Sequence, residues 1–125
     1  MEWNRKEVDR MSIVHKSYRD VQPEIPDEKG ANNVTIRWLI SKKDGAENFA
    51  MRLFEIEEGG CSPYHRHDWE HEVFILEGKG KLVAEGREEE LNPGDFVFVP
   101  PMEWHQFKNA GKDKLKFLCL IPIKD

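Results

Sequence analysis

The stretch His65-Arg66-His67-Asp68-Trp69-Glu70-His71 places three histidines within seven residues of a chain that contains five. Side chains at positions i, i+2 and i+6 of an extended strand lie on one face, so all three imidazoles can point the same way. Imidazole is the commonest side-chain ligand of transition metals. A group of surface histidines in a polar loop is the simpler alternative. However, three imidazoles on one inward strand face without a metal would leave ring nitrogens with few partners.

A fourth histidine, His105, follows His71 by 34 positions and comes after Pro100-Pro101. Its same-face neighbour in a strand is Phe107, and an adjacent strand could bring His105 to the first three. We therefore expect a metal site made by His65, His67, His71 and His105. His15 stands alone in a polar segment, where we expect it to be exposed.

Around this cluster the apolar residues alternate with a period of two, which predicts short strands separated by turns. The expected strands cover residues 34–41, 49–56, 73–76, 81–85, 88–91, 96–99, 104–108 and 115–121, and Glu58-Gly59-Gly60 is expected to end the second. Turn signals recur about every ten residues, which is typical of an antiparallel sandwich or barrel. Residues 34–125 are therefore predicted to form one barrel.

Residues 1–33 are polar and are interrupted by Pro23, Pro26 and Gly30. We interpret them as an N-terminal arm or edge strand, with room for a short helix over residues 5–11. A solvated extension that covers a sheet edge explains this composition without any chemistry.

Length and charge limit the classes of function. A chain of 125 residues holds one compact core, and 24 acidic against 19 basic residues give a net charge of −5. This charge disfavours nucleic acid as a partner. No stretch approaches the roughly 20 apolar residues of a membrane span, and no apolar signal region follows Met1, so we expect a cytoplasmic protein away from membranes. The two cysteines are expected to be free thiols.

Two motifs carry a family resemblance. The segment Gly59-x5-His65-x-His67-x3-His71-x6-Gly78 resembles the first motif of the cupin superfamily. The segment Gly94-x5-Pro100-x-Met102-x2-His105-x3-Asn109 is similar to the second, with Met102 in place of its second glycine. The resemblance implies an all-β fold, a double-stranded β-helix also called a cupin or jelly-roll barrel, which is usually dimeric.

Cupins usually carry a glutamate where this sequence has His71. Glu72 is the alternative ligand, but the usual six-residue gap to Gly78 and strand parity both select His71. Four histidines resemble a subset of compact single-domain cupins that hold manganese or a similar ion. Manganese is therefore favoured, and iron, nickel, copper and zinc stay open.

Four more residues are candidates for the cavity wall. Arg52 either orients an anionic ligand inside the barrel or points outward to a glutamate. Phe107 shares a face with His105. Strand parity predicts that Phe117 and Cys119 point inward, where they either face the ion or belong to the ordinary core. Three further residues have two readings each: Cys61 is a fifth ligand or a free thiol, and Tyr64 and Trp104 line the mouth or simply pack.

Four neutral imidazoles on an octahedral ion leave two open positions, whereas a tetrahedral zinc would be saturated. The sequence therefore favours a metal-dependent oxidoreductase of dioxygenase type that acts on a small organic substrate. A small-ligand binding or sensing module and a metal-dependent isomerase are the alternatives. Both faces of the strands around residues 73–76 and 115–121 are apolar, which predicts a homodimer with the arm contributing to the interface.

Overall fold

The computed structural model describes residues 13–124 and contains eight strands with two short 3₁₀ helices. The strands are β1 (Asn32–Ile40), β2 (Phe49–Cys61), β3 (His71–Glu77), β4 (Gly80–Ala84), β5 (Arg87–Leu91), β6 (Phe96–Val99), β7 (His105–Asn109) and β8 (Leu115–Pro122). The 3₁₀ helices are η1 (Tyr18–Asp20) and η2 (Lys42–Asp44). The expected all-β architecture is confirmed.

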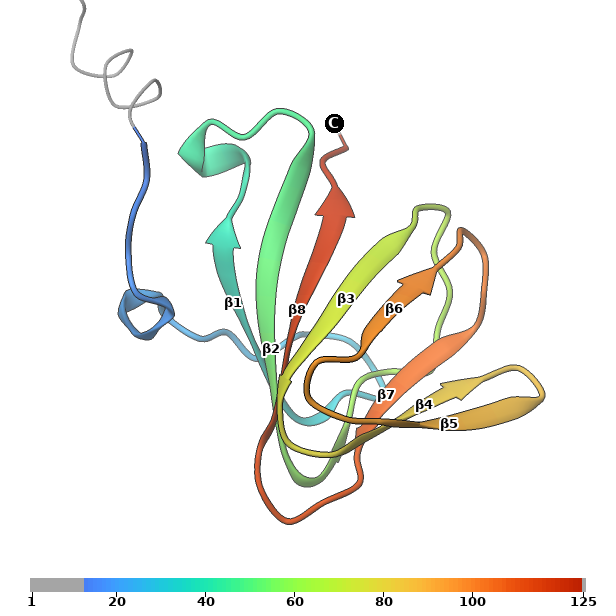
Figure 1. Ribbon diagram of the computed structural model, residues 1–125. Helices are drawn as coiled ribbons and strands as arrows, with labels where there is room; N and C mark the ends of the chain where they lie inside the picture. Colours follow the sequence, from blue (N-terminus) through green and yellow to red (C-terminus); the bar gives the residue numbers. More distant parts are fainter. Residues whose placement is uncertain (1–12, 125) are drawn as a thin grey trace, which may run out of the picture.

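All strand pairs are antiparallel, in the order β5-β4-β7-β2-β8-β3-β6, with β1 on the free edge of β2. The sheet curls so that β7, β4 and β5 lie across from β2, β8, β3 and β6 (Figure 1). The end of β2 joins the two halves, because Cys61 pairs with Lys108 of β7. Residues far apart in sequence therefore face one another across a common interior.

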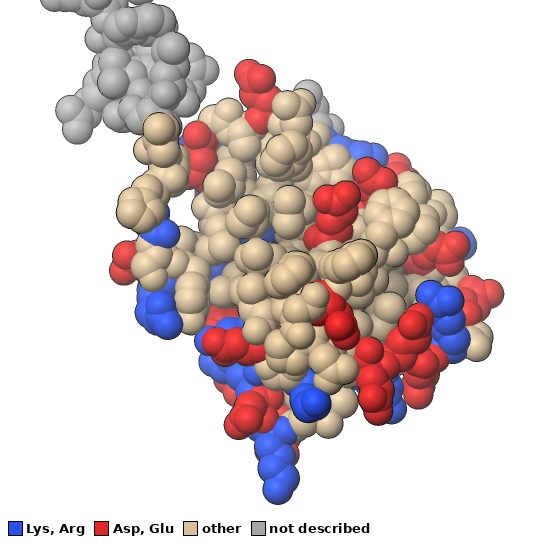
Figure 2. All heavy atoms as spheres, viewed as in Figure 1, with Lys and Arg blue, Asp and Glu red and all other residues tan. Residues whose placement is uncertain are grey.

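The outer face of β3 and β6 carries large apolar side chains. Phe96 is 82% exposed and pairs across the strands with Phe74, which in turn pairs with Leu118 of β8. Figure 2 shows uncharged residues over much of the central surface, with charged side chains mainly around its lower edge and right side. These strands are apolar on both sides, as their sequence predicts.

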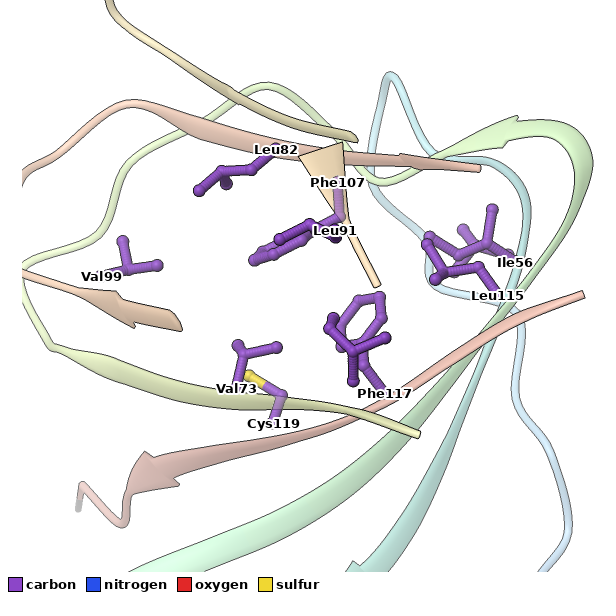
Figure 3. Close-up of a cluster of buried hydrophobic side chains, with 11 residues drawn as sticks. Ile56, Val73, Leu82, Leu91, Val99, Phe107, Leu115, Phe117 and Cys119 are labelled. Atoms are coloured by element: carbon purple, nitrogen blue, oxygen red, sulfur yellow. The ribbon is translucent and has the colours of Figure 1, made fainter. Parts of the chain in front are cut away.

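The interior is filled by side chains from both halves (Figure 3). In β8, Leu115, Phe117 and Cys119 are at most 2% exposed, which confirms the predicted inward parity. The Phe117 ring stacks on that of Phe54 (5.0 Å between centroids) and lies 4.9 Å from that of Phe107. These three aromatic rings therefore pack together in the interior and line the same cavity as the histidines.

Two local expectations were wrong. Glu58-Gly59-Gly60 does not end β2, which continues to Cys61 because its last residue pairs with both Asn32 and Lys108. The segment from His65 to His71 is also not one strand. His65 forms an isolated bridge with His105, the chain is irregular after it, and β3 begins at His71. The common direction of these histidines therefore comes from the loop and not from strand parity.

Met102 has a φ of 68°, in the left-handed region that favours glycine. This is the position at which the second motif has a glycine. Its N–H donates to the His67 carbonyl (2.5 Å), so the turn before β7 is tied to the histidine loop.

The described part of the arm runs along β1. Glu24 and Ile36 exchange two backbone hydrogen bonds of 2.8 Å, and the Arg37 guanidinium donates to the carbonyls of Tyr18 and Val21. Residues 18–24 of the arm therefore lie along the edge of β1. The helix expected over residues 5–11 lies outside the described residues.

Candidate metal centre

The interior holds a cavity of about 280 Å³ that is open at one end of the barrel. Its walls come from the arm, the loop after β2 and strands of both halves. The lining residues are Pro26, Glu28, Val34, Ile36, Arg52, Phe54, Ser62, Pro63, His65, His67, Trp69, His71, His105, Phe107, Phe117 and Cys119. The surface is mainly apolar, and its polar groups are concentrated around the histidines.

Three histidines form the centre of this polar region. One ring nitrogen from each of His65, His67 and His105 lies within 4.8 Å of the others. The backbones of His65 and His105 exchange two hydrogen bonds of 3.0 and 3.1 Å, which fix one side of the group. The Nε2 atoms of His65 and His67 are 3.1 Å apart.

His71 lies beside this group at the start of β3, where it pairs with Val99. Its ring centroid is 5.0 Å from that of His105 and 5.1 Å from that of His67. Its Nε2 is buried and has no hydrogen-bond partner among the described residues. The side chain of Glu72, the alternative ligand, is exposed on the other face of the strand.

In three of the four histidines, the other ring nitrogen, Nδ1, lies within hydrogen-bond distance of a neighbouring group. His65 Nδ1 lies 2.5 Å from the Glu28 carboxylate, and His105 Nδ1 lies 2.9 Å from the Glu103 carbonyl. His71 Nδ1 lies 3.3 Å from Cys119 Sγ. An N–H that donates outward leaves Nε2 free to ligate and fixes the orientation of the ring.

Burial keeps the inner histidines neutral. Desolvation, reinforced by the neighbouring imidazoles, lowers the pKa of His67 to about 4. Desolvation together with His105 and Arg52 lowers the pKa of His71 to about 3. The pKa of His105 is also lowered, again chiefly by desolvation. A metal ligand must be unprotonated, so these rings are ready to bind at neutral pH.

These residues fit a divalent transition metal. Ligand nitrogens about 2.1 Å from an ion and at right angles are about 3 Å apart, close to the His65–His67 separation. A buried Nε2 without a partner is costly unless something binds it. Neutral imidazoles suit zinc, copper, iron and nickel in general. The donor set therefore fits a metal but does not select one.

The other candidates divide into two groups. Arg52, Phe107, Phe117 and Cys119 all line the cavity, so Arg52 faces inward. Cys61 lies away from the histidines, 3.7 Å from the Gly30 carbonyl, and both cysteines are free. Tyr64 and Trp104 stack on one another (5.2 Å) and do not line this cavity.

Sequence reasoning missed Glu28 and Trp69. Glu28 lies in the arm, 37 positions before its partner His65, and nothing in the sequence links the two. Trp69 stacks nearly parallel on the His67 ring, with 4.5 Å between centroids. The spacing of two residues between His67 and Trp69 is the local signal that could have suggested this contact.

A family model for the cupin domain matches residues 52–121, which include all four histidines. The chain belongs to the cupin family. The solved structure of the polyketide cyclase RemF from Streptomyces resistomycificus is similar to this cupin, with 38% identity and a TM-score of 0.86. That match covers 90% of this chain and 81% of RemF. The jelly-roll β-barrel fold follows from this likeness.

Two curated relatives have different names. This cupin is 37% identical over 71 residues to 1-methylthio-D-xylulose 5-phosphate methylsulfurylase of Rhodospirillum rubrum. That match covers 57% of this chain and 46% of the enzyme, so the chain spans about half the enzyme's length. This cupin is also 31% identical over 96 residues to the oxalate-binding protein of Thermotoga maritima. That match covers 74% of this chain and 78% of that protein.

Further relatives are named as dioxygenases and as a sugar-phosphate isomerase. The family and the histidine cluster together indicate a divalent metal site. They leave the reaction open, because one fold hosts many chemistries. Among residues 13–124, no helix is long and apolar enough to cross a membrane.

Proposed function

We propose that this cupin holds a divalent transition metal through His65, His67, His71 and His105. The resemblance to four-histidine cupins favours manganese, which the donor set alone does not select. The buried Nε2 of His71, which has no protein partner among the described residues, is the observation that carries the proposal. The Nδ1 contacts of His65, His71 and His105 support it, because they hold the rings and leave each Nε2 available to a metal.

We further propose that the bound metal serves a dioxygenase-type oxidoreductase acting on a small organic substrate. Such an ion would supply Lewis acidity and, for a redox-active metal, electron transfer at its open positions. The protein supplies the rest of the site. Phe54, Phe107 and Phe117 exclude water from the cavity floor and give a flat substrate a surface to pack on.

Non-oxidative cyclisation of a small polyketone is the second candidate. It is favoured by the similarity to RemF over most of both chains, whereas the match to quercetin 2,3-dioxygenase of Bacillus subtilis covers 22% of that enzyme. Sugar isomerisation has less support, because it needs a free base. Among residues 13–124, Glu28 is the only carboxylate on the cavity wall, and it contacts His65.

One experiment separates these functions. The protein is reconstituted with manganese, iron, nickel, copper or zinc, and metal content is measured by plasma mass spectrometry. Each form is then given catechols, thiols, β-diketones and a linear polyketone long enough to cyclise with loss of water, in air and under argon. Oxygen uptake that matches substrate loss supports the dioxygenase. Substrate loss that is equally fast under argon supports cyclisation, and binding without turnover supports a sensing role.

The ligand assignment predicts different effects for two adjacent substitutions. His71→Ala removes a buried imidazole that faces the other three, whereas Glu72→Ala removes an exposed carboxylate on the opposite face. We expect His71→Ala to lower bound metal at least about tenfold, and Glu72→Ala to leave it near wild type. Equal losses, or a larger loss for Glu72→Ala, would contradict the assignment.

A further inference from the structure

Arg52 places a guanidinium inside the barrel. It comes from the middle of β2, lines the same cavity as the histidines, and donates from Nη2 to Cys119 Sγ at 3.0 Å. The same sulfur lies 3.3 Å from His71 Nδ1. One sulfur atom therefore connects the cation to a proposed metal ligand, so the two lie close together in the cavity.

This cation has no counter-ion in the described part of the chain. None of the ion pairs among residues 13–124 includes Arg52, and its Nε is buried without a hydrogen-bond partner. By contrast Arg37, on the neighbouring strand, has Glu55 at 2.7 Å. Arg52 as a whole is partly buried, and a partly buried cation with a buried, unpartnered Nε and no carboxylate nearby carries a desolvation cost that an anionic ligand would relieve.

Aromatic rings hold the guanidinium in place. Its central carbon lies 4.9 Å from the centroid of the Phe54 ring and 5.4 Å from that of Trp38. A planar guanidinium held over these rings presents a fork of donors that matches a carboxylate or an enolate. The position of the charge is therefore set before any ligand arrives.

The charges of the site also favour an anion. Among the described residues of the cavity wall, Arg52 is the only Lys or Arg and Glu28 is the only Asp or Glu, so their formal charges sum to zero. Neutral imidazoles would leave a bound divalent ion with its full charge. The remaining wall is apolar and aromatic, and the cavity of about 280 Å³ holds about nine water volumes of 30 Å³.

We infer that Arg52 forms an anion subsite, and that the ligand of this cupin is a small, flat organic anion. A carboxylate or enolate oxygen of the ligand meets the guanidinium, and its apolar frame packs on Phe54, Phe107 and Phe117. The inference depends on the proposed function in one respect only, which is that the proposed metal would bind a second oxygen of the ligand. Arg52 thereby determines specificity for charge.

The test uses benzoate and benzamide, which share a shape and differ in charge. Their dissociation constants are measured by calorimetry on the full chain, metal-free and manganese-loaded. We expect the wild type to bind benzoate at least about tenfold more tightly than benzamide, as a charge-assisted hydrogen bond provides. Arg52→Met should abolish this preference in metal-free protein, and Arg52→Lys should keep part of it. Arg19→Met is the matched control, because Arg19 also lies over a ring, that of Tyr18, but on the surface.

The metal-free arm separates this inference from the proposed function. A preference for benzoate there supports the anion subsite even if the protein takes up no metal. Equal affinities of the wild type for both probes in the metal-free arm overturn the subsite without reference to any variant. A preference that appears only with manganese and survives Arg52→Met would assign it to the ion, and would overturn the subsite while supporting the metal site.

Discussion

At the scale of single residues, the Glu28 carboxylate is the arm's contribution to the centre. Its contact with His65 Nδ1 fixes the orientation of the ring. We expect Glu28→Gln to weaken manganese affinity by about tenfold, the lower end of the range for such partners. Competition with a fluorescent chelator measures this. Asp27→Asn, an exposed neighbour with the same change of charge, is the control, and an equal effect in both variants would argue against a positioning role.

Met102 gives a second prediction at this scale. A left-handed conformation costs a non-glycine residue about 1–2 kcal/mol, more than the 0.5–1 kcal/mol of chain entropy that glycine costs. Met102→Gly should therefore raise the free energy of unfolding by up to about 1 kcal/mol, and Met102→Val, which is β-branched, should lower it. Urea denaturation measures both. A destabilised glycine variant would show that contacts of the half-exposed Met102 side chain outweigh the strain.

At the scale of elements, the outer faces of β3, β6 and β8 predict assembly. Phe74, Phe96 and Leu118 form a row across these strands, while the described arm is fixed to β1 and to Lys116. Such a row needs a partner surface, and we expect a homodimer.

Light scattering tests this expectation. The wild type should have a mass near twice 14.7 kDa at micromolar concentration. Phe96→Glu should shift it to the monomer, since a carboxylate would be buried without a partner. Glu89→Lys on β5 is a control for charge change alone. A wild-type mass near 14.7 kDa would refute the dimer.

At the scale of the whole molecule, the buried histidines link stability to pH. The pKa values of His67 and His71 are about 4 and 3 in the folded protein, against about 6.5 when unfolded. Between these values the unfolded chain binds more protons, so the metal-free protein should be most stable above pH 6.5 and lose stability as the pH falls toward 4.

Thermal melting of metal-free protein from pH 7.5 to 5 checks the sign. His71→Gln removes one titrating group and should show a smaller fall in melting temperature over this range. His15→Gln, on the exposed arm, should behave like the wild type. A wild type whose melting temperature rises toward pH 5 would contradict the linkage.

The sequence by itself determined what depends on neighbours along the chain. Period-two alternation predicted the strands and the inward side of β8, and the two spaced motifs predicted the cupin fold. Motif spacing also favoured His71 over Glu72 as a ligand, and that choice stays a prediction. Parity failed for His65 and His67, because that segment is an irregular loop whose direction is set by pairing with β7.

Only the tertiary structure decided which distant groups meet. Glu28 reaches His65 across 37 positions, Cys119 reaches His71 across 48, and Arg52 reaches Cys119 across 67. These contacts depend on how the arm is fixed to β1 and how the sheet curls, which no local pattern encodes. The direction of Arg52 was open for the same reason. Arg52 has apolar neighbours along β2, so the local sequence is compatible with either face of the strand. Its direction is decided by β8 and by the rings of Trp38 and Phe54.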